Sequence, residues 1–167
     1  MDLIKKNKEF VDSLDKNSKE LLTKLSKGQH PNALVITCSD SRVIPEKIFN
    51  LTFGELFVIR TAGNVINDGE LASLEYGIAH LNVSLIVVLA HTHCGAIHAS
   101  IYGEHGEYLD PILSKIKENI LTETDEEKAS ILNAKAVAKC IKKKFPSYKG
   151  EIVAMLYNIE NGLVKCI

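Results

Sequence analysis

Two apolar, β-branched runs in this chain each lead into a cluster of chemically reactive side chains. Residues 33–37 (ALVIT) lead into residues 38–42 (CSDSR), and residues 85–89 (LIVVL) lead, one residue later, into residues 91–95 (HTHCG). Short continuous apolar runs are typical of strands that are buried on both faces of a parallel sheet. Because ligands in open α/β sheets bind at the carboxyl ends of strands, both clusters are expected at one functional edge.

Helical periodicity alternates with strand signals along the rest of the chain. The expected strands cover residues 33–37, 56–60, 85–89, 151–158 and 163–166. The expected helices cover residues 2–27 in two pieces, 45–49, 68–81, about 95–103, 108–121 and 124–145. Thr124-x-x-Glu127 is a capping-box pattern that marks the start of the last helix. This alternation predicts βαβ units and a mostly parallel sheet, and Asn161-Gly162 predicts a turn into an antiparallel edge strand.

Length and composition indicate one globular domain over residues 1–167. The chain is 46% hydrophobic, and a domain of this size buries roughly 70% of its unfolded surface, so it does not need a metal merely to fold. An α/β core is expected over residues 32–167. An amphipathic helical arm is expected over residues 1–28, packed either on its own sheet or on a partner subunit.

Charge and hydropathy exclude several classes of partner. The formal net charge is −1, which leaves no electrostatic footprint for nucleic acid. No apolar run approaches the length of a membrane span, and the first residues lack the apolar region of a signal peptide, so a cytoplasmic location is expected. In that compartment the four cysteines are expected to be metal ligands, nucleophiles or buried thiols rather than disulfides.

The two clusters together contain a soft ligand set that suits zinc. Cys38 and Cys94 are far apart in the sequence, so their thiols can meet only if the two strands are neighbours. His91 lies three residues before Cys94 and is favoured as the third ligand. His93 is adjacent to Cys94, which is a poor geometry for binding the same ion.

The paired motifs closely resemble those of the β-class carbonic anhydrases. The resemblance covers residues 32–99, including the segments 43–46 (VIPE), 57–64 (FVIRTAGN) and 73–76 (SLEY), and extends more loosely over residues 151–166. It implies a central, mostly parallel sheet in the order 2-1-3-4 with an antiparallel edge strand, flanked by helices and preceded by the helical arm.

The resemblance also implies a zinc ion held by Cys38, His91 and Cys94. The implied reaction is the reversible hydration of CO2 to bicarbonate and a proton, by attack of zinc-bound hydroxide. Arg42 would hold Asp40 so that its carboxylate orients the hydroxide. Freed from Arg42, Asp40 could instead be a fourth zinc ligand in a closed form of the site.

The family resemblance further implies a homodimer or a dimer of dimers. In such an assembly the N-terminal helices wrap over the partner subunit, which would explain why residues 1–28 are amphipathic. The only other partner expected is the small substrate, CO2 or bicarbonate, with no nucleic acid and no membrane. His93, His98 and His105 are candidates for the group that carries the product proton away.

Three alternative functions are consistent with parts of this pattern. A hydrolase of CS2 or COS on the same scaffold would need the same zinc site. A non-catalytic module that binds zinc or bicarbonate would not require the pair of Asp40 and Arg42. An enzyme with Cys38 as nucleophile is disfavoured, because Ser39-Asp40-Ser41 is not the glycine-rich anion cradle of a phosphatase loop. Cys140, in a helical pattern, and Cys166, in the last strand, have no such polar neighbours and are expected to be ordinary thiols.

Overall fold

The computed structural model describes residues 1–167, which divide into two compact units. The first unit covers residues 1–30 and the second covers residues 31–167. The division falls beside the boundary predicted between the helical arm and the α/β core.

The first unit consists of two short helices, α1 (Leu3–Ser13) and α2 (Lys16–Leu25). Each begins after an aspartate whose carboxylate accepts a backbone N–H: Asp2 from Lys5 at 3.0 Å, and Asp15 from Ser18 at 2.7 Å. Neither helix contains a buried residue. This unit therefore folds its backbone locally but leaves most of its apolar side chains exposed.

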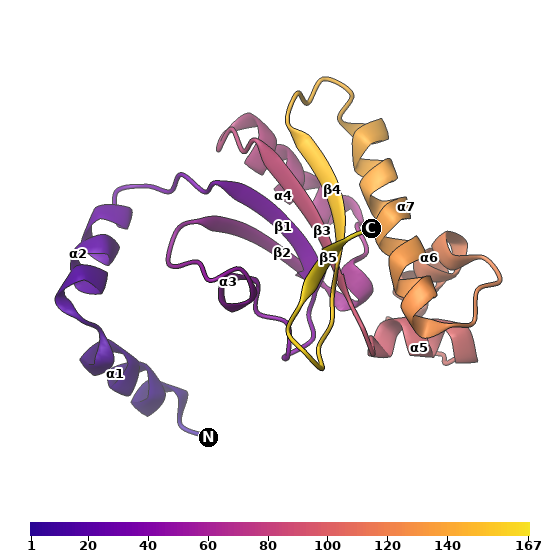
Figure 1. Ribbon diagram of the computed structural model, residues 1–167, viewed down its shortest axis with the longest axis horizontal. Coiled ribbons are helices and arrows are strands. Elements are labelled where there is room, and N and C mark those ends of the chain that lie inside the picture. The colour runs from indigo at the N-terminus through magenta and orange to yellow at the C-terminus, as the bar shows by residue number, and fades with distance from the viewer. The chain divides into compact units, whose positions relative to one another are not determined.

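The second unit is built on a five-stranded sheet. Its strands are β1 (Ala33–Cys38), β2 (Leu56–Thr61), β3 (Leu85–His91), β4 (Glu151–Tyr157) and β5 (Val164–Cys166). Their spatial order is β2-β1-β3-β4-β5, with the first four parallel and β5 antiparallel to β4 (Figure 1). The predicted fold class and strand order are confirmed.

Helices cover both faces of this sheet. They are α3 (Pro45–Ile48), the 3-10 turn η1 (Ala62–Asn64), α4 (Asp68–Ala79), α5 (Gly95–Tyr102), α6 (Asp110–Ile120) and α7 (Glu126–Lys144). On one face, Leu34 and Ile36 of β1 pack in a core with residues of α4 and α7, and Figure 1 shows α7 running beside β4. On the other face, Val35 packs in a separate core that includes Ile48 of α3. Because β1 is buried on both faces, its sequence is a continuous apolar run.

The ends of the elements differ from the predicted ends by at most two residues. One predicted cap is wrong: α7 begins after Asp125 rather than at Thr124. The Asp125 carboxylate accepts the backbone N–H of Lys128 at 2.9 Å. Because the carboxylate of Asp125 already caps the helix, Thr124 is not needed as the cap residue. None of the helices is long and apolar enough to cross a membrane.

Candidate metal centre

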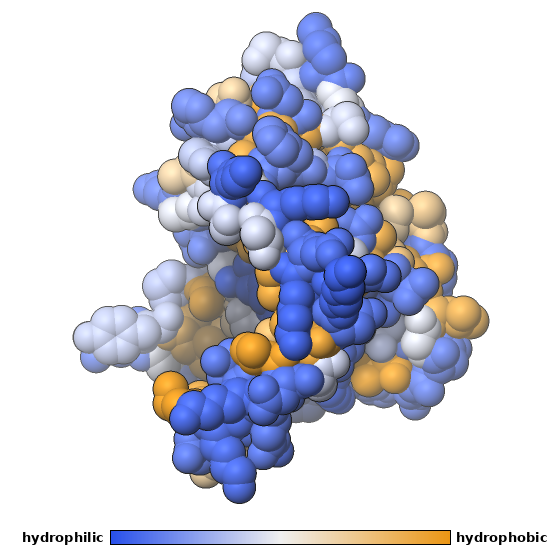
Figure 2. All heavy atoms as spheres, turned by 90° about the vertical axis from the view of Figure 1, so that its left-hand side faces the viewer, coloured by the Kyte–Doolittle hydropathy of each residue, from blue (hydrophilic) through white to orange (hydrophobic).

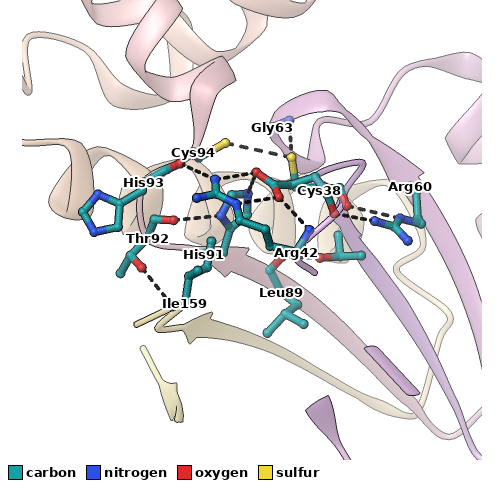
Figure 3. Close-up of polar contacts among 12 residues, drawn as sticks. Cys38, Arg42, Arg60, Gly63, Leu89, His91, Thr92, His93, Cys94 and Ile159 are labelled. Carbon is teal, nitrogen blue, oxygen red and sulfur yellow. Dashed lines mark hydrogen bonds and ion pairs between the residues drawn. The ribbon is translucent and has the colours of Figure 1, made fainter. Parts of the chain in front are cut away.

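The parallel pairing of β1 with β3 brings the two predicted clusters together. Thr37 stands opposite Leu89 in this pairing, so the segments after both strands emerge at the same edge of the sheet. Three potential ligand atoms, from Cys38, His91 and Cys94, lie within 4.8 Å of one another, and all three residues are buried (Figure 3). The structure thus brings together the three residues that the sequence predicted as a zinc-binding set.

The imidazole of His91 is oriented by a bond to the neighbouring backbone. Its Nδ1 lies 2.8 Å from the carbonyl oxygen of Thr92, which can only accept, so Nδ1 carries the proton and donates. The other ring nitrogen, Nε2, is buried and has no hydrogen-bond partner. An unprotonated, unpartnered imidazole nitrogen in the interior is costly unless it binds something, and a metal ion is its usual partner.

The two thiols are close enough to affect each other's ionisation. Their sulfur atoms lie 4.0 Å apart, and the backbone N–H of Gly63 donates to the Cys38 sulfur at 3.3 Å. Hydrogen bonds, chiefly the one from Cys94 and with a contribution from the N–H of Gly63, lower the pKa of Cys38 to about 4 despite burial. The same bond to Cys38, together with burial, raises the pKa of Cys94. The thiolate of Cys38 is therefore stabilised without a cation, whereas Cys94 needs a positive charge beside it to ionise as well.

Asp40 and Arg42 form a two-pronged ion pair next to this cluster. Nε of Arg42 donates to Oδ1 of Asp40 at 2.9 Å, and Nη2 donates to Oδ2 at 2.7 Å. The backbone N–H of Arg42 also donates to Oδ1. The side-chain bonds from Arg42 are the main reason why the pKa of Asp40 is lowered to about 2. Oδ2 of Asp40 lies 4.0 Å from Nε2 of His91, so an ionised carboxylate borders the metal-ligand cluster.

A second arginine, Arg60, holds the backbone of the same loop. From β2 it donates through Nε to the carbonyl of Cys38 at 3.3 Å and through Nη2 to the carbonyl of Asp40 at 2.7 Å (Figure 3). The sequence prediction assigned no separate role to Arg60 or to Gly63. The available signal was its position: Arg60 is the last residue but one of the edge strand β2, and the next residue, Thr61, stands opposite Cys38.

The remaining histidines and cysteines lie outside the cluster. His93 has a left-handed backbone (φ 56°), and its ring points away from the two sulfur atoms, towards Glu160 at 3.6 Å (Figure 3). Nδ1 of His98 lies 2.7 Å from the carboxylate of Glu126. A role for these histidines in proton transfer stays a prediction. Cys140 is half-buried and Cys166 is exposed, and neither belongs to the metal-ligand cluster.

His105, the third candidate for proton transfer, is the most exposed of the set. Its Nδ1 lies 3.6 Å from the carboxylate of Asp110 at the start of α6. Its contact is therefore with a helix end rather than with the Cys38 cluster.

Comparisons with known proteins agree with this geometry. The sequence model of the carbonic anhydrase family matches residues 33–164. A carbonic anhydrase from Synechococcus elongatus is 48% identical over 101 residues, which cover 57% of this chain and 37% of that relative. Carbonic anhydrase 2 from Mycobacterium tuberculosis is 34% identical over 157 residues, which cover 83% of this chain and 75% of that relative.

Solved structures add the fold to this relationship. One of two tetrameric β-carbonic anhydrases from Sordaria macrospora matches with a TM-score of 0.88 and 26% identity, covering 99% of this chain and 94% of that chain. A mostly parallel sheet that presents a Cys-His-Cys cluster at its carboxyl edge defines the general class, an α/β protein with a candidate metal-binding site. Within that class, the chain belongs to the carbonic anhydrase family, in its β class.

The ion pair at Asp40 makes part of the folding stability depend on pH. Folding lowers the pKa of Asp40 to about 2 from an ordinary value of 3.8. The ionised carboxylate therefore stabilises the folded state above about pH 4, and this contribution is lost as the pH falls towards 2. We expect Asp40→Asn to lower the urea midpoint at neutral pH, and this deficit to shrink below about pH 4. Urea unfolding from about pH 7 to about pH 3 measures it.

The matched control for this experiment is Asp68→Asn, which changes an exposed carboxylate outside the site. A deficit for Asp40→Asn that stays constant over the whole pH range would contradict the assignment of the ion pair.

Proposed function

We propose that this protein catalyses the zinc-dependent, reversible hydration of CO2 to bicarbonate and a proton. The observation that carries the proposal is the buried Cys-His-Cys cluster of Cys38, His91 and Cys94 with the Asp40–Arg42 pair at its border. Family membership supports the same reaction, since the relatives compared above are carbonic anhydrases.

The donor set fits zinc. Two sulfur atoms and the unpartnered Nε2 of His91 make three soft or borderline ligands, and a catalytic zinc site typically uses three protein ligands and one open position. When bound, zinc would supply a nucleophile at neutral pH by lowering the pKa of a water molecule. The bond from Nδ1 of His91 to the Thr92 carbonyl fixes the ring orientation that such a ligand needs.

Asp40 is placed to orient the attacking oxygen. Arg42 holds both of its carboxylate oxygens, so the carboxylate has one orientation and stays ionised. An ionised carboxylate accepts a hydrogen bond but cannot donate one, so the attacking oxygen must turn its proton towards Asp40 and its lone pair towards CO2. The same two bonds keep Asp40 from becoming a fourth metal ligand.

The first test is CO2 hydration by stopped flow on protein of known zinc content. We expect about one zinc per chain and turnover that rises with zinc content. Cys94→Ser should lose both zinc and activity, because a serine hydroxyl is a poor zinc ligand. Cys140→Ser is the matched control, since this half-buried cysteine lies outside the cluster and should leave zinc and turnover unchanged.

Full zinc content without CO2 hydration at any pH would overturn the proposal. Assays of COS and CS2 hydrolysis on the same preparation would then separate a related hydrolase from a non-catalytic zinc protein.

The proposed role of Asp40 gives a separate expectation. Asp40→Ala should keep its zinc and lose about two to four orders of magnitude in turnover, since it removes a positioned proton acceptor. Arg42→Ala should also keep zinc but lose turnover, because the freed carboxylate can bind the metal. Zinc content and stopped-flow rates measure both effects. An Asp40→Ala protein with near wild-type turnover would contradict this role.

We further propose that α1 and α2 pack against a second copy of this chain. Both helices lack buried residues, and their exposed apolar side chains include Leu3, Ile4, Val11 and Leu22. Figure 2 shows apolar residues reaching the surface as separate patches between hydrophilic ones. A solved relative from Sordaria macrospora is described as tetrameric. Covering apolar helix faces with a second copy would remove them from water, which favours association.

Light scattering at micromolar concentration tests this proposal. Wild-type protein should be at least dimeric, and Ile4→Glu should shift it towards smaller species, because a carboxylate would be buried in the contact. Lys5→Glu is the control, because helix periodicity places this exposed residue on the side of α1 opposite its apolar residues. A wild-type monomer would contradict the proposal.

A further inference from the structure

Gly63 is held by hydrogen bonds at both its backbone N–H and its backbone carbonyl. Its N–H donates to the sulfur of Cys38 at 3.3 Å, and its carbonyl accepts from Nδ2 of Asn133 at 2.8 Å. Asn133 lies on α7, far from Gly63 in the sequence. The bond to the metal-ligand thiol is therefore linked to a helix that contributes no residue to the cluster itself.

The orientation of the Asn133 amide is determined by its two partners. The carbonyl of Gly63 can only accept, so the NH2 group of Asn133 must face it. The remaining oxygen, Oδ1, accepts from Nδ2 of Asn119 on α6 at 2.9 Å. A chain of hydrogen bonds thus runs from Asn119 through Asn133 and Gly63 to the sulfur of Cys38.

Gly63 needs such support because its own backbone does not fix it. Its φ of +66° lies in the left-handed region, which glycine enters freely and other residues enter at a cost. A Cβ at this position would lie 2.6 Å from Cδ1 of Ile116 and 3.2 Å from Cβ of Ala96. The close packing of α6 and α5 excludes a side chain here, and the bonds at the N–H and at the carbonyl hold the glycine backbone in place.

The burial of Asn133 argues that its amide serves this purpose. Its side chain is fully buried, and Ala129 and Ala134 beside it on α7 are buried in apolar clusters. Burying an amide costs free energy unless its groups are bonded, and an apolar residue would fill the same space without that cost. What the amide adds is its donor to Gly63 and its acceptor for Asn119.

We propose that Asn133 is a positioning residue which, through Gly63, sets the charge that Cys38 donates to the bound metal. A hydrogen bond to a thiolate withdraws charge from the sulfur, which leaves the metal a stronger Lewis acid. Asn133 supports that bond by holding the carbonyl of Gly63, which restrains the backbone of the same residue whose N–H bonds the sulfur. This inference rests on the proposed metal site. It goes beyond that site by assigning a function to a residue that contacts neither the three proposed ligands nor Asp40.

Cobalt-substituted protein provides the test, because the thiolate-to-cobalt charge-transfer band reports the charge on the sulfur. In Asn133→Ala we expect this band to move to longer wavelength, and CO2 turnover of the zinc form to fall by about tenfold. Asn119→Ala should move the band in the same direction by less, since it removes only the support of Asn133. Ser130→Ala is the matched control: its buried hydroxyl also lies on α7 but donates only to the carbonyl of Glu126.

Three outcomes would decide the question. A band that moves in both asparagine variants and not in Ser130→Ala supports the proposal. A folded, metal-loaded Asn133→Ala protein with an unshifted band overturns it, as does an unshifted band in Asn119→Ala if the Asn133 variant does not fold. Wild-type protein that takes up neither zinc nor cobalt would instead overturn the metal site itself, so the two failures are distinguishable.

Discussion

The parallel pairing of β1 with β3 is the interaction on which the site depends. It runs from Ala33 opposite Leu85 to Thr37 opposite Leu89, and it brings together two thiols that are 56 residues apart in the sequence. A slip of one residue would turn every side chain of β1 to the other face of the sheet, so the two buried cores fix the register. The same packing that stabilises the sheet therefore sets the distances at the metal-ligand cluster.

The residues around the cluster leave it in need of a cation. One thiol is acidified by the other, the second keeps its proton, and Nε2 of His91 has no partner. Arginines stand nearby, but Arg42 is bound to the carboxylate of Asp40, and Arg60 is bound to backbone carbonyls. Both guanidinium groups hold the loop in place rather than neutralise the sulfur atoms. This separation keeps the ligand atoms available for a metal while the loop stays ordered.

Support for the cluster comes from helices that contribute no ligand. Asn133 of α7 and Asn119 of α6 are linked to the Cys38 sulfur only through the backbone of Gly63. Neither residue stands out in the sequence, because an asparagine within a helical pattern carries no distinctive signal. Likewise, the start of α7 was misplaced by one residue, since Thr124 and Asp125 are both good caps and only the folded backbone selects between them.

The strands, their order and the three residues of the cluster could all be predicted from the sequence. Continuous apolar runs identify buried parallel strands. The resemblance of the two motifs to one family implies the order of the strands and the proximity of Cys38 and Cys94. The folded chain was needed to see which nitrogen of His91 is free, how Asp40 is held, and which backbone N–H donates to the Cys38 sulfur. The reason is physical: strand patterns arise from local periodicity, whereas hydrogen bonds between distant elements depend on ångström-scale distances that exist only after the chain has packed.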